Sequence, residues 1–187
     1  IGPVVDADGH LVTDTDAIAL RMPPEFRELA QSGGLGRLFP PPDHLHSAQP
    51  VRMLEGSFEQ VGVDGWLNFM ADVGIDFATV FPTGGLSYGL INNRDWAIAA
   101  CRAYNDWLHD TYLEASDSFV GVGLIPIQDP EVAVLELRRI VEDLGMAGAM
   151  LPTSGIPNHL GAKEYWPIYA EADRLGCCLA VHGGSHS

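Results

Sequence analysis

The sequence predicts an α/β protein built on a parallel sheet with helices on both faces. Three observations lead to this fold class. Short, almost continuously apolar segments, several of them ended by proline, are typical of strands that are buried on both sides. Segments with apolar side chains at helical spacing alternate with them, as in repeated βα units. The 187 residues, 47% of them hydrophobic, suffice for the core of one domain.

Residues 4–10, VVDADGH, form the first predicted strand, which two aspartates and a histidine interrupt. Residues 11–60 then break the alternation, because they are rich in proline and glycine (PPEF, SGGLG, FPPPDH). We interpret them as one insertion between the first strand and its helix at about 62–74. An insertion of this length is usually functional, so we expect a lid or a pocket wall. Residues 1–187 as a whole are interpreted as a single, partial domain.

The next unit runs from a strand at 76–82, which Pro82 ends, to a long helix at 92–115. Asn92 or Asn93 is a suitable N-cap for this helix. Spacings of four, three and four residues predict its buried positions, which are Trp96, Ala100, Ala103 and Trp107.

A third strand at 119–126, FVGVGLIP, again ends in proline. Asp129 and Pro130 then provide a capping carboxylate and a proline at the first position of a helix, which Gly145 ends. The predicted apolar stripe of this helix is Ala133, Leu137, Ile140, Val141 and Leu144.

Two further units complete the alternation. Residues 147–152, AGAMLP, predict a fourth strand, and residues 163–176 predict a helix with Pro167 near its first turn. Residues 177–184, CCLAVHGG, predict a fifth strand. With the first segment included, the chain therefore contains five predicted strands.

The composition argues against several classes of function. With 25 acidic against 10 basic residues the formal charge is -15, which disfavours nucleic acid and anionic membranes as partners. No apolar run approaches the roughly 18 residues that span a bilayer, and no basic segment with an apolar core suggests a signal peptide. Cys101, Cys177 and Cys178 do not form a disulfide framework. Buried free thiols favour a reducing compartment, so we expect the cytoplasm.

Three side chains suggest a metal site. Asp8 and His10 are two residues apart on a strand, so they point to the same face, and His10 lies at the carboxyl end. His182 ends the fifth strand in the same way. Parallel barrels keep their chemistry at this end, and Zn²⁺ takes imidazole and carboxylate ligands. A histidine at a strand end is also an ordinary polar terminus, so the residues alone leave both interpretations open.

Four segments carry a resemblance to a known family. They are VVDADGH, RAYNDWL at 102–108, the stretch FVGVGLIPIQDPEVAVLELRRIVEDLGMAGAMLP at 119–152, and YWPIYAEADRLGCCLAVHGG at 165–184. The chain resembles the amidohydrolase-related metal-dependent family that includes aminocarboxymuconate-semialdehyde decarboxylase and the dihydroxybenzoate decarboxylases. The resemblance implies the first five βα units of a distorted (β/α)8 TIM barrel. It also implies one catalytic divalent metal, for which we expect zinc, with manganese or another ion as the alternative.

The resemblance also assigns residues. Family members use a His-x-His or Glu-x-His pair on the first strand, and the matching positions are Asp8 and His10. The family histidine after the fifth strand matches His182. Asp6 has no role in this match and is interpreted as a hydrogen-bonded polar residue near the barrel floor. The family pattern needs another histidine and an aspartate that carries a proton, and neither falls within 1–187. We therefore expect no catalytic acid or base here, and interpret the chain as part of a longer one.

The expected function is that of a metal-dependent decarboxylase or hydrolase acting on a small carboxylated molecule, and the resemblance favours decarboxylation. Arg52 and His46, both in the insertion, are candidates for substrate contact, since a guanidinium pairs bidentately with a carboxylate. Both could equally be surface residues. An alternative of a different class is a non-catalytic half-barrel that a partner chain completes. A homodimer is considered as the assembly.

Overall fold

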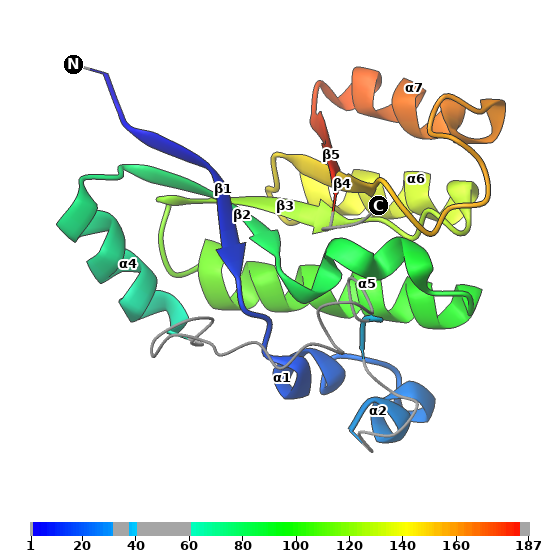
Figure 1. Ribbon diagram of the computed structural model, residues 1–187, viewed down its shortest axis with the longest axis horizontal. Coiled ribbons are helices and arrows are strands. Elements are labelled where there is room, and N and C mark those ends of the chain that lie inside the picture. Colours follow the sequence, from blue (N-terminus) through cyan, green and yellow to red (C-terminus); the bar gives the residue numbers. More distant parts are fainter. Residues whose placement is uncertain (1, 32–37, 41–60, 184–187) are drawn as a thin grey trace, which may run out of the picture.

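The computed structural model describes residues 2–31, 38–40 and 61–183, and the statements below concern these residues. Its five strands form one sheet, in which each strand pairs in parallel with the next one along the chain. The strands are β1 (Val5–Leu11), β2 (Phe77–Pro82), β3 (Phe119–Leu124), β4 (Gly148–Pro152) and β5 (Cys178–His182). All five strands predicted from the sequence are thus present (Figure 1).

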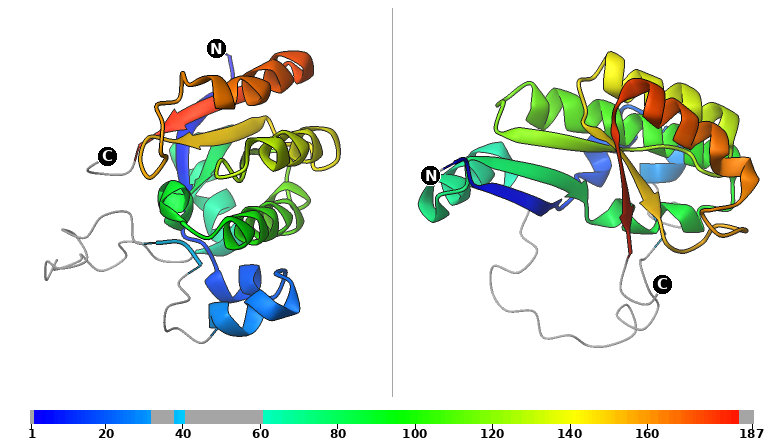
Figure 2. Two further views of the ribbon diagram at one scale, coloured as in Figure 1. Left: turned by 90° about the vertical axis from the view of Figure 1, so that its right-hand side faces the viewer. Right: turned by 90° about the horizontal axis from the view of Figure 1, so that it is seen from above.

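The sheet is strongly curled (Figure 2). In a flat sheet, four spacings of about 4.8 Å would hold β1 and β5 about 19 Å apart. Instead, a carboxylate oxygen of Asp8 in β1 lies 3.0 Å from the His182 ring in β5. The chain therefore forms the curled five-strand part of a (β/α)8 barrel, which confirms the α/β class and the partial TIM barrel that the resemblance implies.

Four helices connect successive strands and lie along the outer side of the curl (Figure 2). They are α4 (Gly62–Val73), α5 (Arg94–Leu108), α6 (Pro130–Glu142) and α7 (Trp166–Leu175). They do not cover both faces of the sheet, because the curl makes the other face the inside of a barrel. Among the described helices, none is both long and apolar enough to cross a bilayer. Shorter helical segments are η1 (Gly84–Leu90), η2 (His109–Leu113) and η3 (Lys163–Tyr165).

The helix ends follow the local sequence signals. Asn93 caps α5, because its side-chain oxygen accepts the N–H of Trp96 at 2.9 Å. Asp129 caps α6 in the same way, and Gly145 follows that helix with a φ of 65°. The predicted helix at 92–115 ends its α-helical part at Leu108, after which η2 continues with π-helical geometry. All four predicted core positions of α5 are buried: Trp96, Ala100, Ala103 and Trp107.

The first part of the predicted insertion is helical. It contains α1 (Thr15–Ala19) and α2 (Pro24–Gln31). Ile18 and Met22 are buried, and the Phe26 ring packs edge-on against Trp96 of α5 with 5.6 Å between centroids. These helices therefore extend the outer helical layer. Residues 41–60 lie outside the described residues, so the lid stays a prediction.

The buried side chain of Asn105 takes the place of a neighbouring strand at the end of β3. The pairing of β2 with β3 ends at Val80 and Gly121. Three residues further on, Asn105 of α5 accepts the N–H of Leu124 and donates to its C=O, both at 2.8 Å. The same amide also donates to Glu136 of α6 at 2.8 Å. Asn105 thus holds the end of β3 where β2 has turned away, a role that the sequence did not reveal.

Candidate metal centre

The carboxyl ends of β1 and β5 bring three side-chain atoms together. His182 Nε2 lies 3.0 Å from Asp8 Oδ1 and 3.2 Å from His10 Nε2. His10 Nε2 lies 3.4 Å from the same Asp8 oxygen. The three residues predicted as metal ligands therefore converge on one place, although 172 residues separate the two histidines along the chain.

These separations agree with the spacing of ligands around one cation. For metal–ligand bonds of about 2.1 Å, ligand atoms lie about 3.4 Å apart at tetrahedral angles and about 3.0 Å apart at octahedral angles. The three observed distances of 3.0, 3.2 and 3.4 Å fall within this interval. The donor set of one carboxylate and two imidazoles suits zinc or manganese. The residues therefore fit a divalent ion.

The hydrogen bond that His182 makes with the backbone orients its ring towards the other two ligands. Its Nδ1 lies 3.0 Å from the carbonyl oxygen of Gly183, and a carbonyl can only accept, so Nδ1 is the donor. In the neutral ring, Nε2 then carries only a lone pair, and it faces the Asp8 carboxylate. Two lone-pair atoms 3.0 Å apart repel each other unless a proton or a metal ion supplies positive charge. Such a backbone contact is also how ligating histidines are oriented.

An aromatic side chain covers part of the site. The Phe81 ring of β2 lies with its centroid 6.1 Å from that of His10 and 5.2 Å from that of His182. Partial burial lowers the pKa of His10 below 6.5; Asp8 opposes this shift, and His182 adds to it. A lowered pKa keeps the His10 ring neutral at neutral pH, and the neutral ring is the form that binds a metal.

The structure does not place every predicted residue. His46 and Arg52 lie outside the described residues. Asp6 does not join the ligand atoms, but its Oδ1 accepts the backbone N–H of Asp8 at 3.1 Å. The sequence offered no signal for this contact beyond the spacing of two aspartates.

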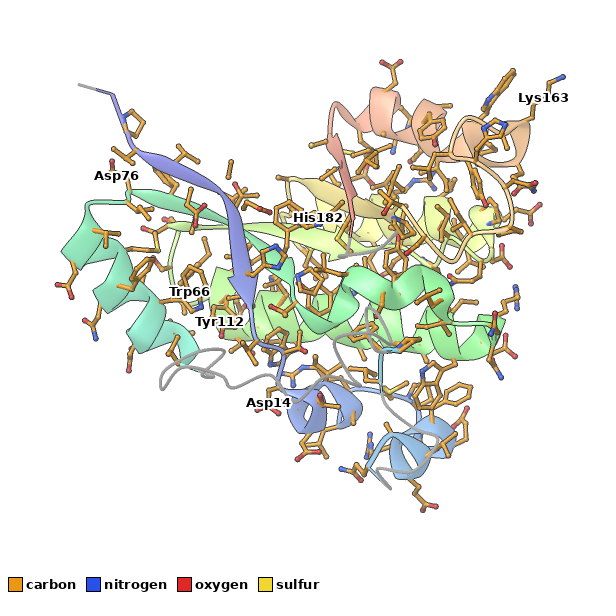
Figure 3. All side chains as sticks on the ribbon, in the orientation of Figure 1. Asp14, Trp66, Asp76, Tyr112, Lys163 and His182 are labelled. Carbon is orange, nitrogen blue, oxygen red and sulfur yellow. The ribbon has the colours of Figure 1, made fainter. Side chains whose placement is uncertain are left out.

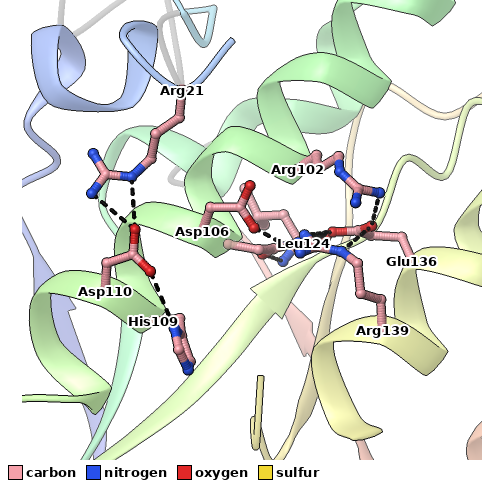
Figure 4. Close-up of polar contacts among 9 residues, drawn as sticks. Arg21, Arg102, Asp106, His109, Asp110, Leu124, Glu136 and Arg139 are labelled. Atoms are coloured by element: carbon pink, nitrogen blue, oxygen red, sulfur yellow. Dashed lines mark hydrogen bonds and ion pairs between the residues drawn. The ribbon is translucent and has the colours of Figure 1, made fainter. Parts of the chain in front are cut away.

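A second group of potential ligands lies on η2 and at the residue that follows it. The side chains of His109, Asp110 and Glu114 come within 4.8 Å of one another. Arg21 of the α1–α2 segment donates to the Asp110 carboxylate from two nitrogens, at 3.1 and 3.3 Å (Figure 4). The guanidinium already neutralises this carboxylate, so the group is explained by an ion pair.

Comparisons with known proteins find similar sequences and folds. The sequence model of the family described as Amidohydrolase matches residues 5–187. A 2-amino-3-carboxymuconate-6-semialdehyde decarboxylase of Dictyostelium discoideum is 26% identical over 168 residues, which are 85% of this chain and 45% of that protein. A gamma-resorcylate decarboxylase of Rhodococcus jostii is 33% identical over 101 residues, 49% of this chain and 31% of that protein.

Solved structures show the same fold. A 5-carboxyvanillate decarboxylase of Novosphingobium aromaticivorans, complexed with manganese and 4-hydroxy-3-methoxy-5-nitrobenzoic acid, superimposes with a TM-score of 0.70 and 19% identity, covering 97% of this chain and 50% of that one. A dihydroxybenzoic acid decarboxylase of a Polaromonas species, with bound manganese and 2-nitroresorcinol, superimposes with a TM-score of 0.66 and 21% identity. The match covers 98% of this chain and 50% of that one. The chain spans about half the length of these proteins.

Proposed function

We propose that this chain, which belongs to the amidohydrolase family, carries the metal-binding part of a decarboxylase acting on a small carboxylated molecule. The observation that carries the proposal is the convergence of Asp8, His10 and His182 within 3.4 Å. The same ligands would serve a hydrolase. The names of the similar proteins, which are decarboxylases of carboxylated small molecules, support decarboxylation.

The roles of the individual residues follow from their contacts. Asp8, His10 and His182 would hold the ion, which when bound supplies positive charge for a substrate carboxylate and a neighbouring oxygen. Gly183 keeps His182 in the tautomer that presents Nε2. Phe81 provides an apolar surface against one side of the two imidazole rings. We assign no proton donor for the carbon atom that loses CO₂ to residues 1–187.

Several finer points are part of the proposal. The sequence favours zinc, whereas the similar structures contain manganese, and the ligand distances suit either ion. Substrate contact by Arg52 and His46, a lid within 11–60, a single domain over 1–187, a homodimer and a cytoplasmic location all stay predictions. The support for a carboxylated substrate is that similar proteins are named for such compounds.

Metal analysis tests the ligand set. The natural protein is purified without chelators, and its metal content is measured by inductively coupled plasma mass spectrometry. It should contain about one zinc or manganese ion per chain. A variant combining His10→Ala and His182→Ala should lose it. His159→Ala, which changes an exposed histidine of the β4–α7 connection, should retain it. A protein that neither contains a divalent ion nor takes up Mn²⁺ or Zn²⁺ would refute the proposal.

An activity assay tests the reaction. The metal-loaded protein should release CO₂ from a carboxylated aromatic probe such as 2,6-dihydroxybenzoate or 5-carboxyvanillate, and the double histidine variant should not. Release of an amine or alcohol from an amide or ester panel, without CO₂ release from the carboxylates, would instead identify a hydrolase. A metal-loaded protein that is inactive on both panels would favour the non-catalytic half-barrel.

A further inference from the structure

β1 contains one more residue than its partner at the place where the candidate ligands begin. Asp6 faces Ala78 of β2, but the next paired residue, Gly9, faces Val80. Three steps along β1 therefore correspond to two steps along β2. This is the pattern of a β-bulge, which inserts an extra residue and changes the direction of the side chains that follow.

The bulge decides which aspartate can be a ligand. In a regular strand, Asp6, Asp8 and His10 would all point to one face, because side chains alternate with a period of two. Paired residues of neighbouring strands lie on the same face, and Ala78 and Val80 share a face of β2. Asp6 and Gly9 therefore lie on that face together, although they are three residues apart. His10 pairs with Phe81, whose ring contacts both imidazoles, so the opposite face holds the candidate metal centre.

The Asp6 carboxylate is bonded within this bulge. Its Oδ1 accepts the N–H of Asp8 at 3.1 Å. Its Oδ2 lies over Gly9, where an added Cβ would come within 3.2 Å of that oxygen and 3.1 Å of the Thr79 carbonyl. The Trp66 side chain of α4 would lie 3.4 Å from the same Cβ. Gly9 is thus the residue that leaves room for Asp6 to reach the backbone of Asp8.

Asp8 needs such support more than the two histidines do. Its side chain is 69% exposed, so packing does not fix its orientation, whereas the side chains of His10 and His182 are 29% and 19% exposed. The hydrogen bond from the Asp8 N–H to Asp6 is therefore the contact by which the fold can direct the Asp8 carboxylate towards the two imidazole rings. A contact of this kind acts through the ligand and touches neither metal nor substrate.

We infer that Asp6 is a positioning residue of the metal centre, which caps the β1 bulge and thereby presents Asp8 together with His10 and His182. The inference rests on the proposed function. It requires a hydrogen-bond acceptor at position 6 and does not require a negative charge there.

The experiment compares four variants of the natural protein in Mn²⁺ affinity, measured by calorimetry on metal-free protein, and in the visible spectrum of the Co²⁺-loaded form. Asp6→Ala removes the acceptor and should weaken Mn²⁺ binding about 10-fold or more and alter the Co²⁺ bands. Asp6→Asn keeps an oxygen acceptor and should bind within about 3-fold of the parent. Gly9→Ala keeps Asp6 but crowds the bulge, so it should also weaken binding.

The matched control is Asp76→Ala. Asp76 also accepts a backbone N–H of this strand segment, that of Val4 at 2.7 Å, but it lies away from His182 (Figure 3). This variant should bind Mn²⁺ within about 2-fold of the parent and should leave the Co²⁺ bands unchanged. It therefore corrects for the general effect of losing one carboxylate–backbone bond.

The outcomes separate the two proposals. If the parent protein binds no metal, the proposed function fails. If the parent binds metal but Asp6→Ala binds equally well, or Asp6→Asn is as weak as Asp6→Ala, the positioning role is wrong. Should Asp6→Ala fail to fold, Gly9→Ala decides, because unchanged metal affinity and Co²⁺ bands in that variant would show that the bulge geometry is not needed.

Discussion

The middle strands and the outer strands of the sheet differ in how they are held, and the candidate metal centre lies on the outer ones. Every residue of β4 is buried, as are five of the six residues of β3. In β1 only two of seven residues are buried, and in β5 none is. The packing of buried side chains therefore stabilises the middle strands of the sheet. The outer strands depend on specific polar contacts, and charged ligands are tolerated there because they keep part of their hydration.

The polar groups of the two regions have correspondingly different tasks. In the middle, Asn105 is fully buried and satisfies the backbone at the end of β3. At the outer strands, Asp6 and Gly183 contact the backbone or the ring of a candidate ligand. The comparison predicts that changes in the middle mainly reduce stability. Changes at the outer strands should mainly reduce metal affinity.

The largest effect is expected from Asn105→Leu. This change removes both partners of the Leu124 backbone and one partner of Glu136 in a buried environment. Each unsatisfied buried group costs about 1–3 kcal/mol, so the free energy of unfolding in urea should fall by about 3 kcal/mol or more. Asn158→Ala, which removes an exposed amide bound to Glu164, should cost less than about 0.5 kcal/mol. A loss below about 1 kcal/mol for Asn105→Leu would mean that β3 does not depend on this contact.

The next largest effect should come from the metal itself. Free Mn²⁺ at 100 times its dissociation constant should raise the free energy of unfolding by about 2.7 kcal/mol. Amide hydrogen exchange should slow chiefly in β1 and β5, because the ion would join these two strands. His182→Ala should abolish both effects. Equal protection of β3 and β4 would contradict the distinction between the two regions.

A smaller, pH-dependent effect is expected where α7, the helix before β5, meets α6. Hydrogen bonds from Arg174 and Arg138 lower the pKa of Glu171 from 4.5 to about 2. A lowered carboxyl pKa stabilises the fold above about pH 4.5, and this contribution is lost as the pH falls towards 2. Both arginines are about half exposed, so solvent screening limits the contribution to about 1–2 kcal/mol.

Urea unfolding at several pH values checks this contribution. At pH 7 the free energy of unfolding of Glu171→Gln should be lower than that of the parent by about 1–2 kcal/mol. This difference should vanish near pH 2. Glu164→Gln, at an exposed carboxylate of the same region, should follow the parent across the range. A stability difference for Glu171→Gln that does not change with pH would rule out the ion pairs as its origin.

Much of the fold could be predicted because its signals are local. Asn93, Asp129 and Gly145 act on neighbouring backbone groups, so their effect is independent of the rest of the chain. The exposure of the cysteines, in contrast, could not be predicted from local signals. Burial was expected for all three cysteines, and Cys101 is buried, but Cys178 is exposed because β5 forms an edge of the described sheet.

The candidate site divides in the same way. The nature of its ligands and their position at strand ends could be inferred from Asp8, His10 and His182 in the sequence. The bulge that separates Asp6 from them could not, because it exists only in the register of β1 against β2. Likewise, the partners of Asn105 come from β3 and α6, which periodicity within α5 cannot reveal.

The sequence by itself determined the order of strands and helices, the ends of the helices and the residues able to bind a metal, since these depend on spacing and residue type. Only the tertiary structure decided that the sheet curls until side chains of β1 and β5 meet, and that a bulge in β1 turns Asp6 away from the two histidines. The physical reason is that curl, register and bulges arise from contacts between segments far apart in the chain. No single segment contains that information.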